Sequence, residues 1–288
     1  MNKLAAVLKL TRIEHSLMLV IAVLAAELLA GGLPQMSVLL LSLISPVFIS
    51  MASFAVNDYF DIKVDKLNRK NRPLVTGELK PADAVYVATV SFAIGVLASA
   101  SINAYAFAIA LIFAILAVLY SYKLKEMLVV GNLYVALTML IPFLFGNYVV
   151  SGALRGSILL ISVMVFFSGF AREIHGTIRD YRGDVKMRRA TTLPRAIGVE
   201  NAALDALLFY LAAVAISIFL FFFVAPFANN PLFGAMIGVS DMMLLYVGLG
   251  YVYKKKRAQQ FYERTRNVSL LAMGLALVAI LISAAVYI

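Results

Sequence analysis

Nine apolar runs, most of them about 20 residues long, follow one another along the chain with short polar connections between them. This is the length that an α-helix needs to cross the hydrocarbon core of a membrane. A segment in hydrocarbon must satisfy its own backbone hydrogen bonds, and a helix does so within the segment. The sequence therefore predicts an all-α, polytopic membrane protein with nine transmembrane helices, forming a single domain over residues 1–288.

Composition supports this class and excludes several others. The chain is 63% hydrophobic and 14% charged, whereas soluble domains are about 45–50% apolar and about 25% charged. The chain has no Cys, which excludes disulfides, thiolate metal sites and a cysteine nucleophile. Two His are too few for a histidine-zinc or haem-rich protein. The net charge of +10 is spread over short loops, which argues against a nucleic-acid partner.

The expected helices are separated by Gly, Pro and charged clusters, and Pro46 and Pro142 predict kinks inside two of them. They are expected over His15–Ala30, Ser37–Phe60, Ala82–Ser101, Ala104–Tyr122, Leu128–Val150, Gly156–Ile178, Asn201–Val224, Pro231–Tyr253 and Asn267–Ile288.

The positions of Lys and Arg predict how the helices cross the membrane. Every Lys and Arg except Arg155 lies in the N-terminal arm or near the connections after the second, fourth, sixth and eighth helices. Cytoplasmic loops carry such an excess of Lys and Arg. We therefore expect a multi-pass protein of the cell (plasma) membrane whose N-terminus and basic loops are cytoplasmic.

Two acidic motifs lie at membrane exits within these basic loops. Asn57, Asp61 and Asp65 are four residues apart and share one helix face, and Asp180 and Asp184 repeat the spacing after another apolar run. Like charges four apart repel, and anions at a helix C-terminus oppose the helix dipole. A cation would relieve both, and oxygen ligands favour Mg²⁺. The alternative is that each motif is a solvated acidic turn.

Cations surround the acidic motifs and indicate a strongly anionic ligand. Carboxylates for metal beside Lys and Arg suit a diphosphate, and the apolar surroundings suit a lipid. Together they point to ionisation of an allylic diphosphate and capture of the cation by an electron-rich acceptor. Simpler readings are an extended turn at Arg72, an interfacial Tyr120 and a Lys123 that only reaches the membrane surface. The cations are Arg69, Arg72, Lys123, Lys186 and Arg188.

At these motifs the sequence resembles the UbiA superfamily of intramembrane prenyltransferases. The resemblance rests on N-x-x-x-D-x-x-x-D at Asn57, continuing through Arg72-Pro73-Leu74 to Gly77, and on D-x-x-x-D at Asp180, followed by Thr192-Leu193-Pro194. It implies nine helices around a central cavity. It also implies that the four aspartates of the two motifs are catalytic and, with Asn57, hold Mg²⁺ on a prenyl diphosphate.

Further site residues follow from the same resemblance. It places Tyr120 and Lys123 near the diphosphate, and the cations Arg69, Arg72 and Lys186 around the motifs are expected to bind the same group. The sequence is most similar to archaeal members that transfer a geranylgeranyl group to the free hydroxyl of geranylgeranylglyceryl phosphate, the second ether bond of archaeal lipids. The acceptor is expected at Arg12, His15 and Arg188.

Two other functions compete with this one. The first is a prenyltransferase with an aromatic acceptor, such as a quinone precursor or a haem. The second is a secondary transporter whose acidic residues carry a coupling ion. A transporter would place its carboxylates near the bilayer midplane, whereas both acidic motifs lie at helix exits.

Overall fold

The computed structural model describes residues 3–67, 71–127, 129–187, 192–254 and 258–287, with only the backbone described at 14 and 182–187. All regular elements in these ranges are helical, which confirms the all-α prediction. They are α1 (Lys3–Thr11), η1 (Ile13–His15), α2 (Ser16–Ala30), α3 (Met36–Leu67), α4 (Pro73–Thr76), α5 (Pro81–Ala100), α6 (Ala104–Tyr122), η2 (Leu124–Glu126), α7 (Val130–Val150), α8 (Gly156–Met187), α9 (Leu193–Ile197), α10 (Val199–Phe223), α11 (Pro231–Tyr253) and α12 (Gln259–Tyr287).

The helices are long enough for a multi-pass membrane protein. Among the described residues, eight helices are long and apolar enough to cross a membrane. The bent pair α1 and α2 provides a ninth span when the two are counted together. They meet at an angle of 53°, and the chain turns at Arg12, whose φ of 48° is in the left-handed region. The nine-span prediction holds with this pair taken as one broken span.

The predicted boundaries agree best for α6 and α11, which begin directly after Asn103 and Asn230 and end directly before Lys123 and Lys254. Two helices are longer at the acidic motifs than the apolar runs predicted. α3 continues to Leu67 instead of ending at Phe60, and α8 continues to Met187 instead of ending at Ile178. Both motifs therefore lie on helices that continue past the apolar run.

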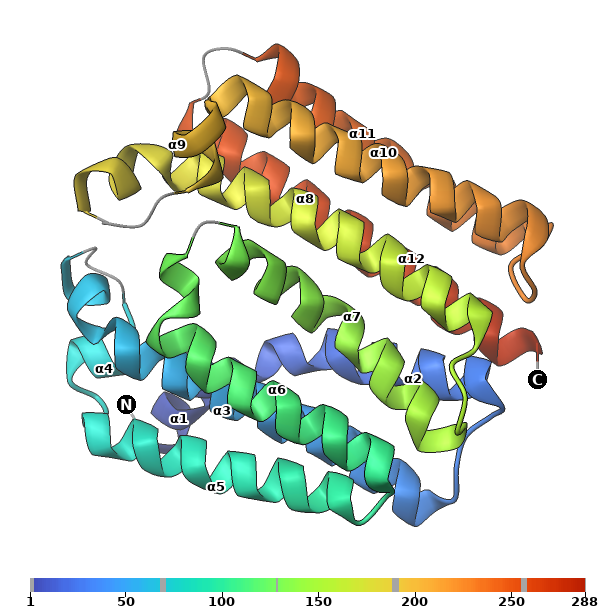
Figure 1. Ribbon diagram of the computed structural model, residues 1–288, viewed down its shortest axis with the longest axis horizontal. Coiled ribbons are helices and arrows are strands. Elements are labelled where there is room, and N and C mark those ends of the chain that lie inside the picture. The colour runs from blue at the N-terminus through green and yellow to red at the C-terminus, as the bar shows by residue number, and fades with distance from the viewer. Residues whose placement is uncertain (1–2, 68–70, 128, 188–191, 255–257, 288) are drawn as a thin grey trace.

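The helices form one bundle that is layered around α2, α7 and α8 (Figure 1). α3, α5 and α6 pack together on one side, and α10, α11 and α12 pack on the other. Buried Ala residues dominate the interfaces, and Gly95 and Gly146 lie directly against neighbouring helices. Small residues let helix backbones approach closely, which is how membrane helices pack without a hydrophobic driving force.

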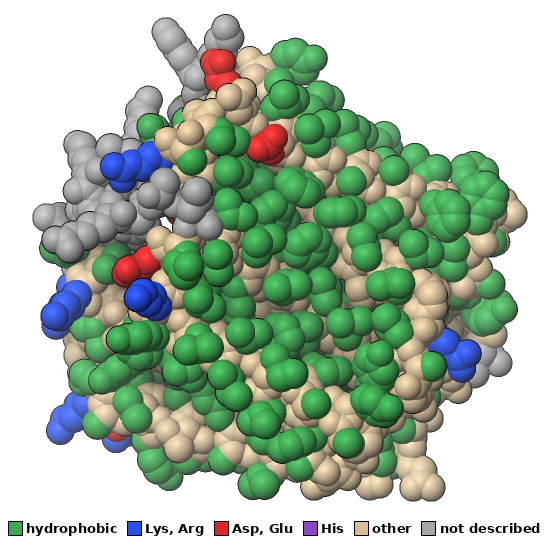
Figure 2. All heavy atoms as spheres, viewed as in Figure 1, with side chains coloured by type: hydrophobic (Ala, Val, Ile, Leu, Met, Phe, Trp, Pro, Cys, Tyr) green, Lys and Arg blue, Asp and Glu red, His purple; other side chains and the backbone are tan. Residues whose placement is uncertain are grey.

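The two ends of the bundle differ in charge. In Figure 1 α4 and α9 lie toward the left, and the C-terminal end of α12 lies at the right. We call the left end the polar end and the right end the far end. Most Lys, Arg, Asp and Glu visible in Figure 2 lie toward the polar end, and the broad middle of that face is apolar.

At the far end, the side chain of Arg155 caps the C-terminal end of α2. Its Nε donates to the carbonyl oxygen of Ala30 in the last turn of α2, at 3.2 Å, and its backbone N–H donates to Oδ1 of Asn147 at 3.1 Å. The C-terminal end of a helix carries partial negative charge, so a cation here is stabilising.

Candidate active site

Two residues of the first acidic motif, Asn57 and Asp61, line a polar cavity from α3, whereas Asp65 does not. Nδ2 of Asn57 donates to Oδ2 of Asp61 at 3.1 Å, and Nζ of Lys125 lies 2.7 Å from Oδ1 of the same carboxylate. Lys125 comes from η2, the short turn after α6, so the pair joins two segments that are 64 residues apart. Both side chains are 14% exposed, which places this ion pair in a partly dehydrated environment.

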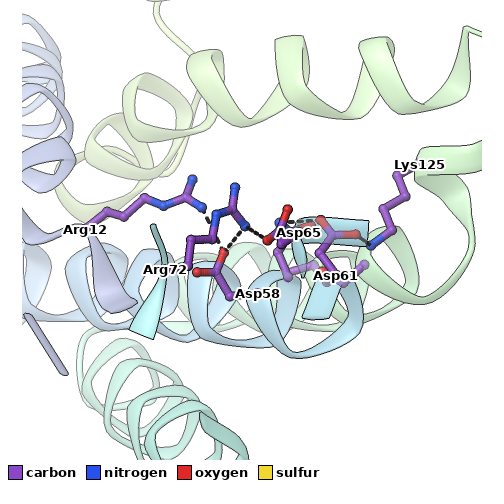
Figure 3. A network of polar contacts seen from close by, with 9 residues as sticks. Arg12, Asp58, Asp61, Asp65, Arg72 and Lys125 are labelled. Atoms are coloured by element: carbon purple, nitrogen blue, oxygen red, sulfur yellow. Dashed lines mark hydrogen bonds and ion pairs between the residues drawn. The ribbon is translucent and has the colours of Figure 1, made fainter. Parts of the chain in front are cut away.

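A second group of ion pairs lies on the adjoining face of α3 (Figure 3). Oδ1 of Asp58 accepts from Nη2 of Arg12 at 2.8 Å and from Nη1 of Arg72 at 2.5 Å. The same Nη1 of Arg72 lies 2.6 Å from Oδ2 of Asp65. Asp58 and Asp65 are 2% and 1% exposed, so two buried carboxylates share one arginine.

Helical geometry explains why Asp58 and Asp65 meet the same arginine. Seven residues make almost two complete turns at 3.6 residues per turn, so positions 58 and 65 lie on one face. Charge balance also explains why α3 does not end at the membrane exit. Each aspartate of its last turns has a cation beside it, supplied by Arg12, Arg72 or Lys125. The unfavourable effect of anions on the C-terminal end of a helix is thereby offset.

Asp180 of the second acidic motif lines the same cavity from α8. Arg179 binds Asp180 with two hydrogen bonds, from Nε at 2.8 Å and from Nη2 at 2.9 Å. About two turns earlier, Nη1 of Arg172 lies 3.4 Å from Oε1 of Glu173. His175 is buried, and its ring stacks on Tyr251 with centroids 3.8 Å apart.

A polar and an apolar cavity meet between the two motifs. The polar cavity, of about 1040 Å³, lies between Asp61 on α3 and Asp180 on α8. The apolar cavity, of about 550 Å³, is lined by α2, α3, α6, α7, α8, α10, α11 and α12 and confirms the predicted central cavity. Three of the described residues line both: Asn57, Tyr120 and Arg172. Such a pair of spaces suits an amphiphilic molecule with a charged head and a hydrocarbon tail.

The polar cavity has the donor atoms that Mg²⁺ prefers. Among the described side chains, no three of the Asp, Glu and His type converge on one point as a metal cluster. Mg²⁺ does not require such a cluster, because it usually binds one or two protein carboxylates together with waters and substrate phosphates. Asp61 and Asp180 line the cavity together with Asn57, so the oxygen donors fit Mg²⁺ bound with an anionic substrate.

The remaining predicted residues lie in different places. Tyr120 stacks on Tyr134, with ring centroids 4.4 Å apart, at the junction of the cavities. His15 lines the apolar cavity beside Phe54, with ring centroids 5.5 Å apart. Lys123 is exposed and lines neither cavity, and Lys125 takes the place beside Asp61. Arg69 and Arg188 lie outside the described residues, as do the side chains of Asp184 and Lys186.

Three charged residues in or beside these cavities were not selected from the sequence. Asp58 follows Asn57 directly, and its distance of seven from Asp65 was the available signal. Lys125 had no such signal, because its position depends on the turn that ends α6. Asp241 lines the apolar cavity in the middle of α11, where its Oδ2 accepts from the hydroxyl of Ser217 at 2.5 Å.

Comparisons with known proteins agree with this arrangement. Residues 18–271 match the UbiA prenyltransferase family. The chain belongs to this family. A digeranylgeranylglyceryl phosphate synthase of Archaeoglobus fulgidus is 38% identical over 280 residues, covering 96% of this chain and 94% of that protein. A synthase of the same name from Thermococcus kodakarensis is 32% identical over 286 residues, covering 98% of each.

Solved structures confirm the UbiA fold. A structure described as digeranylgeranylglyceryl phosphate synthase in membranes has a TM-score of 0.78 to this chain, with 24% identity and 99% of both chains covered. A UbiA homologue from Archaeoglobus fulgidus bound to GPP and Mg²⁺ has a TM-score of 0.64, with 21% identity, covering 96% of this chain and 99% of that chain. The prediction of UbiA membership from the two acidic motifs is therefore confirmed.

Proposed function

We propose that this UbiA protein transfers a geranylgeranyl group from geranylgeranyl diphosphate to the free hydroxyl of geranylgeranylglyceryl phosphate. The observation that carries the proposal is the junction of the two cavities at Asn57, Tyr120 and Arg172. A prenyl diphosphate has its charge at one end and hydrocarbon over the rest. The charged end suits the polar cavity, and the hydrocarbon suits the apolar cavity. The names of the two relatives above support the choice of donor and acceptor.

The polar cavity would hold the diphosphate with Mg²⁺. Asn57, Asp61 and Asp180 supply oxygens from two sides, and Asp65 and Asp184 belong to the same motifs. When bound, Mg²⁺ takes up negative charge that develops on the diphosphate as it leaves. The solved UbiA homologue that contains both GPP and Mg²⁺ supports this assignment.

Cations of the chain would bind and orient the diphosphate. Lys125 and Arg72 line the polar cavity and can donate hydrogen bonds to phosphate oxygens, as charge-assisted bonds of the stronger kind. Arg69 and Lys186, next to the two motifs in sequence, would add positive charge. The apolar cavity would hold the hydrocarbon and keep water from the reacting carbon.

The transfer itself needs no strong base. The bond between the allylic carbon and the diphosphate oxygen breaks, and the electron pair leaves with the diphosphate. The acceptor hydroxyl forms the new carbon–oxygen bond and loses its proton to diphosphate or water. The acceptor also carries a phosphate, so a second group of cations is required. Arg12 and His15 line the apolar cavity near its polar end, and Arg188 lies in the connection after α8.

We place the protein in the plasma membrane with the polar end in the cytoplasm, because along the sequence every Lys and Arg except Arg155 lies in the N-terminal arm or near the connections expected on that side. The chain has no native Cys, so single Cys probes report sidedness directly. A Cys at Ser101 should react with an impermeant maleimide on intact cells, and a Cys at Asn71 only after permeabilisation. Reaction of both from the same side would refute the arrangement.

The acceptor is tested with purified protein, Mg²⁺, labelled geranylgeranyl diphosphate and three acceptors. Geranylgeranylglyceryl phosphate should yield the diether product, and 4-hydroxybenzoate and a naphthoate should yield none. Efficient prenylation of an aromatic acid, with none of the glyceryl phosphate, would refute this acceptor while leaving the prenyltransferase assignment intact.

A further inference from the structure

Asp58 is the point at which two arginines from different parts of the chain meet. Its Oδ1 accepts from both Arg12 and Arg72, at 2.8 and 2.5 Å, and the carboxylate is 2% exposed (Figure 3). Asp58 lines neither the polar nor the apolar cavity. It therefore reaches neither cavity itself, and any effect it has on a bound molecule passes through the two arginines.

The two arginines face different cavities. Arg12 lines the apolar cavity, and Arg72 lines the polar cavity. Their side chains are 26% and 20% exposed, so each guanidinium is partly open to a ligand while it remains bonded to Asp58. One carboxylate thus fixes a cation at each of the two spaces that meet in the candidate active site.

Backbone geometry indicates that Arg12 is held in place. It lies in the break between α1 and α2 with φ 48° and ψ 50°, a left-handed conformation that is strained for a residue other than Gly. The guanidinium also lies over the ring of Phe54, 4.6 Å from its centroid. The ion pair with Asp58 and the cation–π contact with Phe54, both on α3, offset this strain and hold the bend against α3.

Electrostatics explains why the carboxylate is required. Two guanidinium groups that contact one oxygen repel each other, and only a negative charge between them makes the arrangement favourable. Replacing Asp58 by a neutral group leaves two neighbouring cations in a partly buried site, and they move apart. Arg72 would still have Asp65, whereas Arg12 would lose its ion pair with Asp58.

We propose that Asp58 is a positioning residue that holds Arg12 for the acceptor's phosphate and Arg72 for the prenyl diphosphate, so that both substrates are bound side by side. This inference rests on the proposed function, because that function assigns one anionic substrate to each arginine. Asp58 touches neither substrate, and its contribution is to substrate binding rather than to bond breaking.

The test compares Asp58→Asn with wild type in steady-state kinetics for both substrates. Asp58→Asn should raise the KM of the acceptor about tenfold or more, and that of geranylgeranyl diphosphate by less, because Arg72 keeps Asp65. The kcat at saturation should stay within about threefold. Asp83→Asn is the matched control: Asp83 also pairs with a cation of α1, Lys3 at 3.3 Å, and lines neither cavity. Both its KM values should stay unchanged.

A double variant separates positioning from general damage to the fold. In an Arg12→Gln background, Asp58→Asn should raise the acceptor KM no further, because the residue through which it acts is gone. It should still raise the KM of the diphosphate. If Asp58→Asn raises the acceptor KM by the same factor in the wild-type and Arg12→Gln backgrounds, the inference is overturned.

A second variant and a binding measurement cover the cases in which Asp58→Asn does not fold or the wild type does not use the glyceryl phosphate. If Asp58→Asn does not fold in detergent, Asp58→Glu keeps the charge but moves it by one methylene, and it should raise both KM values at unchanged kcat. Unchanged KM values in either folded variant would overturn the inference. If wild type transfers nothing to the glyceryl phosphate, the proposed function fails. The inference is then decided by the Kd of geranylgeranyl diphosphate measured with Mg²⁺, which Asp58→Asn should raise.

Discussion

Two lysines in the turn after α6 allow a sharp test of the candidate site. Lys123 and Lys125 are two residues apart and have the same chemistry, but only Lys125 lines the polar cavity and contacts Asp61. The family resemblance selected Lys123, and the structure indicates Lys125. We expect Lys125→Ala to lower kcat/KM for geranylgeranyl diphosphate strongly and Lys123→Ala to leave it nearly unchanged.

The size of the effect follows from the geometry. At an effective dielectric constant of about 20, charges at the observed separation of 2.7 Å attract by about 6 kcal/mol. Desolvation of the two groups, each 14% exposed, cancels much of this. Hydrogen bonds to charged groups contribute about 1.5–3 kcal/mol net. If Lys125 makes a bond of this strength to the diphosphate, its loss lowers kcat/KM by about 10- to 150-fold.

The assay is transfer of labelled geranylgeranyl diphosphate by detergent-purified protein in Mg²⁺, with initial rates over a range of diphosphate concentrations. Thermal stability of each variant is measured in the same detergent to establish that it is folded. A Lys123→Ala variant that loses as much kcat/KM as Lys125→Ala, or a Lys125→Ala variant with wild-type kinetics, would refute the assignment of Lys125 to the diphosphate.

Two other predictions concern the metal and helix packing. Asp61→Ala and Asp180→Ala should each abolish prenyl transfer in protein that remains folded, and EDTA should abolish it reversibly in wild type; full activity in EDTA would contradict a role for Mg²⁺. A Cβ at Gly146 would lie 2.6 Å from the carbonyl oxygen of Val23, so Gly146→Ala should destabilise by about 1–3 kcal/mol in thermal unfolding. Gly238→Ala is the control, because a Cβ there meets nothing within 4 Å, and it should be neutral or stabilising.

The fold was largely predictable because hydrocarbon imposes one strong rule. A chain in a membrane must form helices, and the length of each apolar run sets the length of the span. That rule fails where a helix leaves the hydrocarbon. α3 continues to Leu67 because Arg12, Arg72 and Lys125 neutralise its last carboxylates, and two of these cations come from distant segments. Hydrophobicity along the sequence contains no information about such contacts.

The candidate site was predictable to the extent that its residues belong to motifs. Spacing brought Asn57 and Asp61 to one face, and both line the polar cavity. Spacing did not indicate that Asp58, one position along, is the carboxylate that joins Arg12 to the motif helix. It also did not distinguish Lys123 from Lys125, because the three-residue turn at the end of α6 decides which lysine faces inward. Tertiary contacts, rather than local periodicity, determine these positions.

The boundary between the polar and apolar cavities has a consequence for how such an enzyme can diversify. Under the proposed function, the diphosphate is fixed at the boundary, so a longer or shorter chain changes only how deep the tail reaches. Length preference is then set by the wall far from the chemistry, where α12 contributes Leu277 and Ile280. Selection for another tail length can act on these apolar residues without disturbing the carboxylates. Chain-length preference and diphosphate binding can therefore change independently.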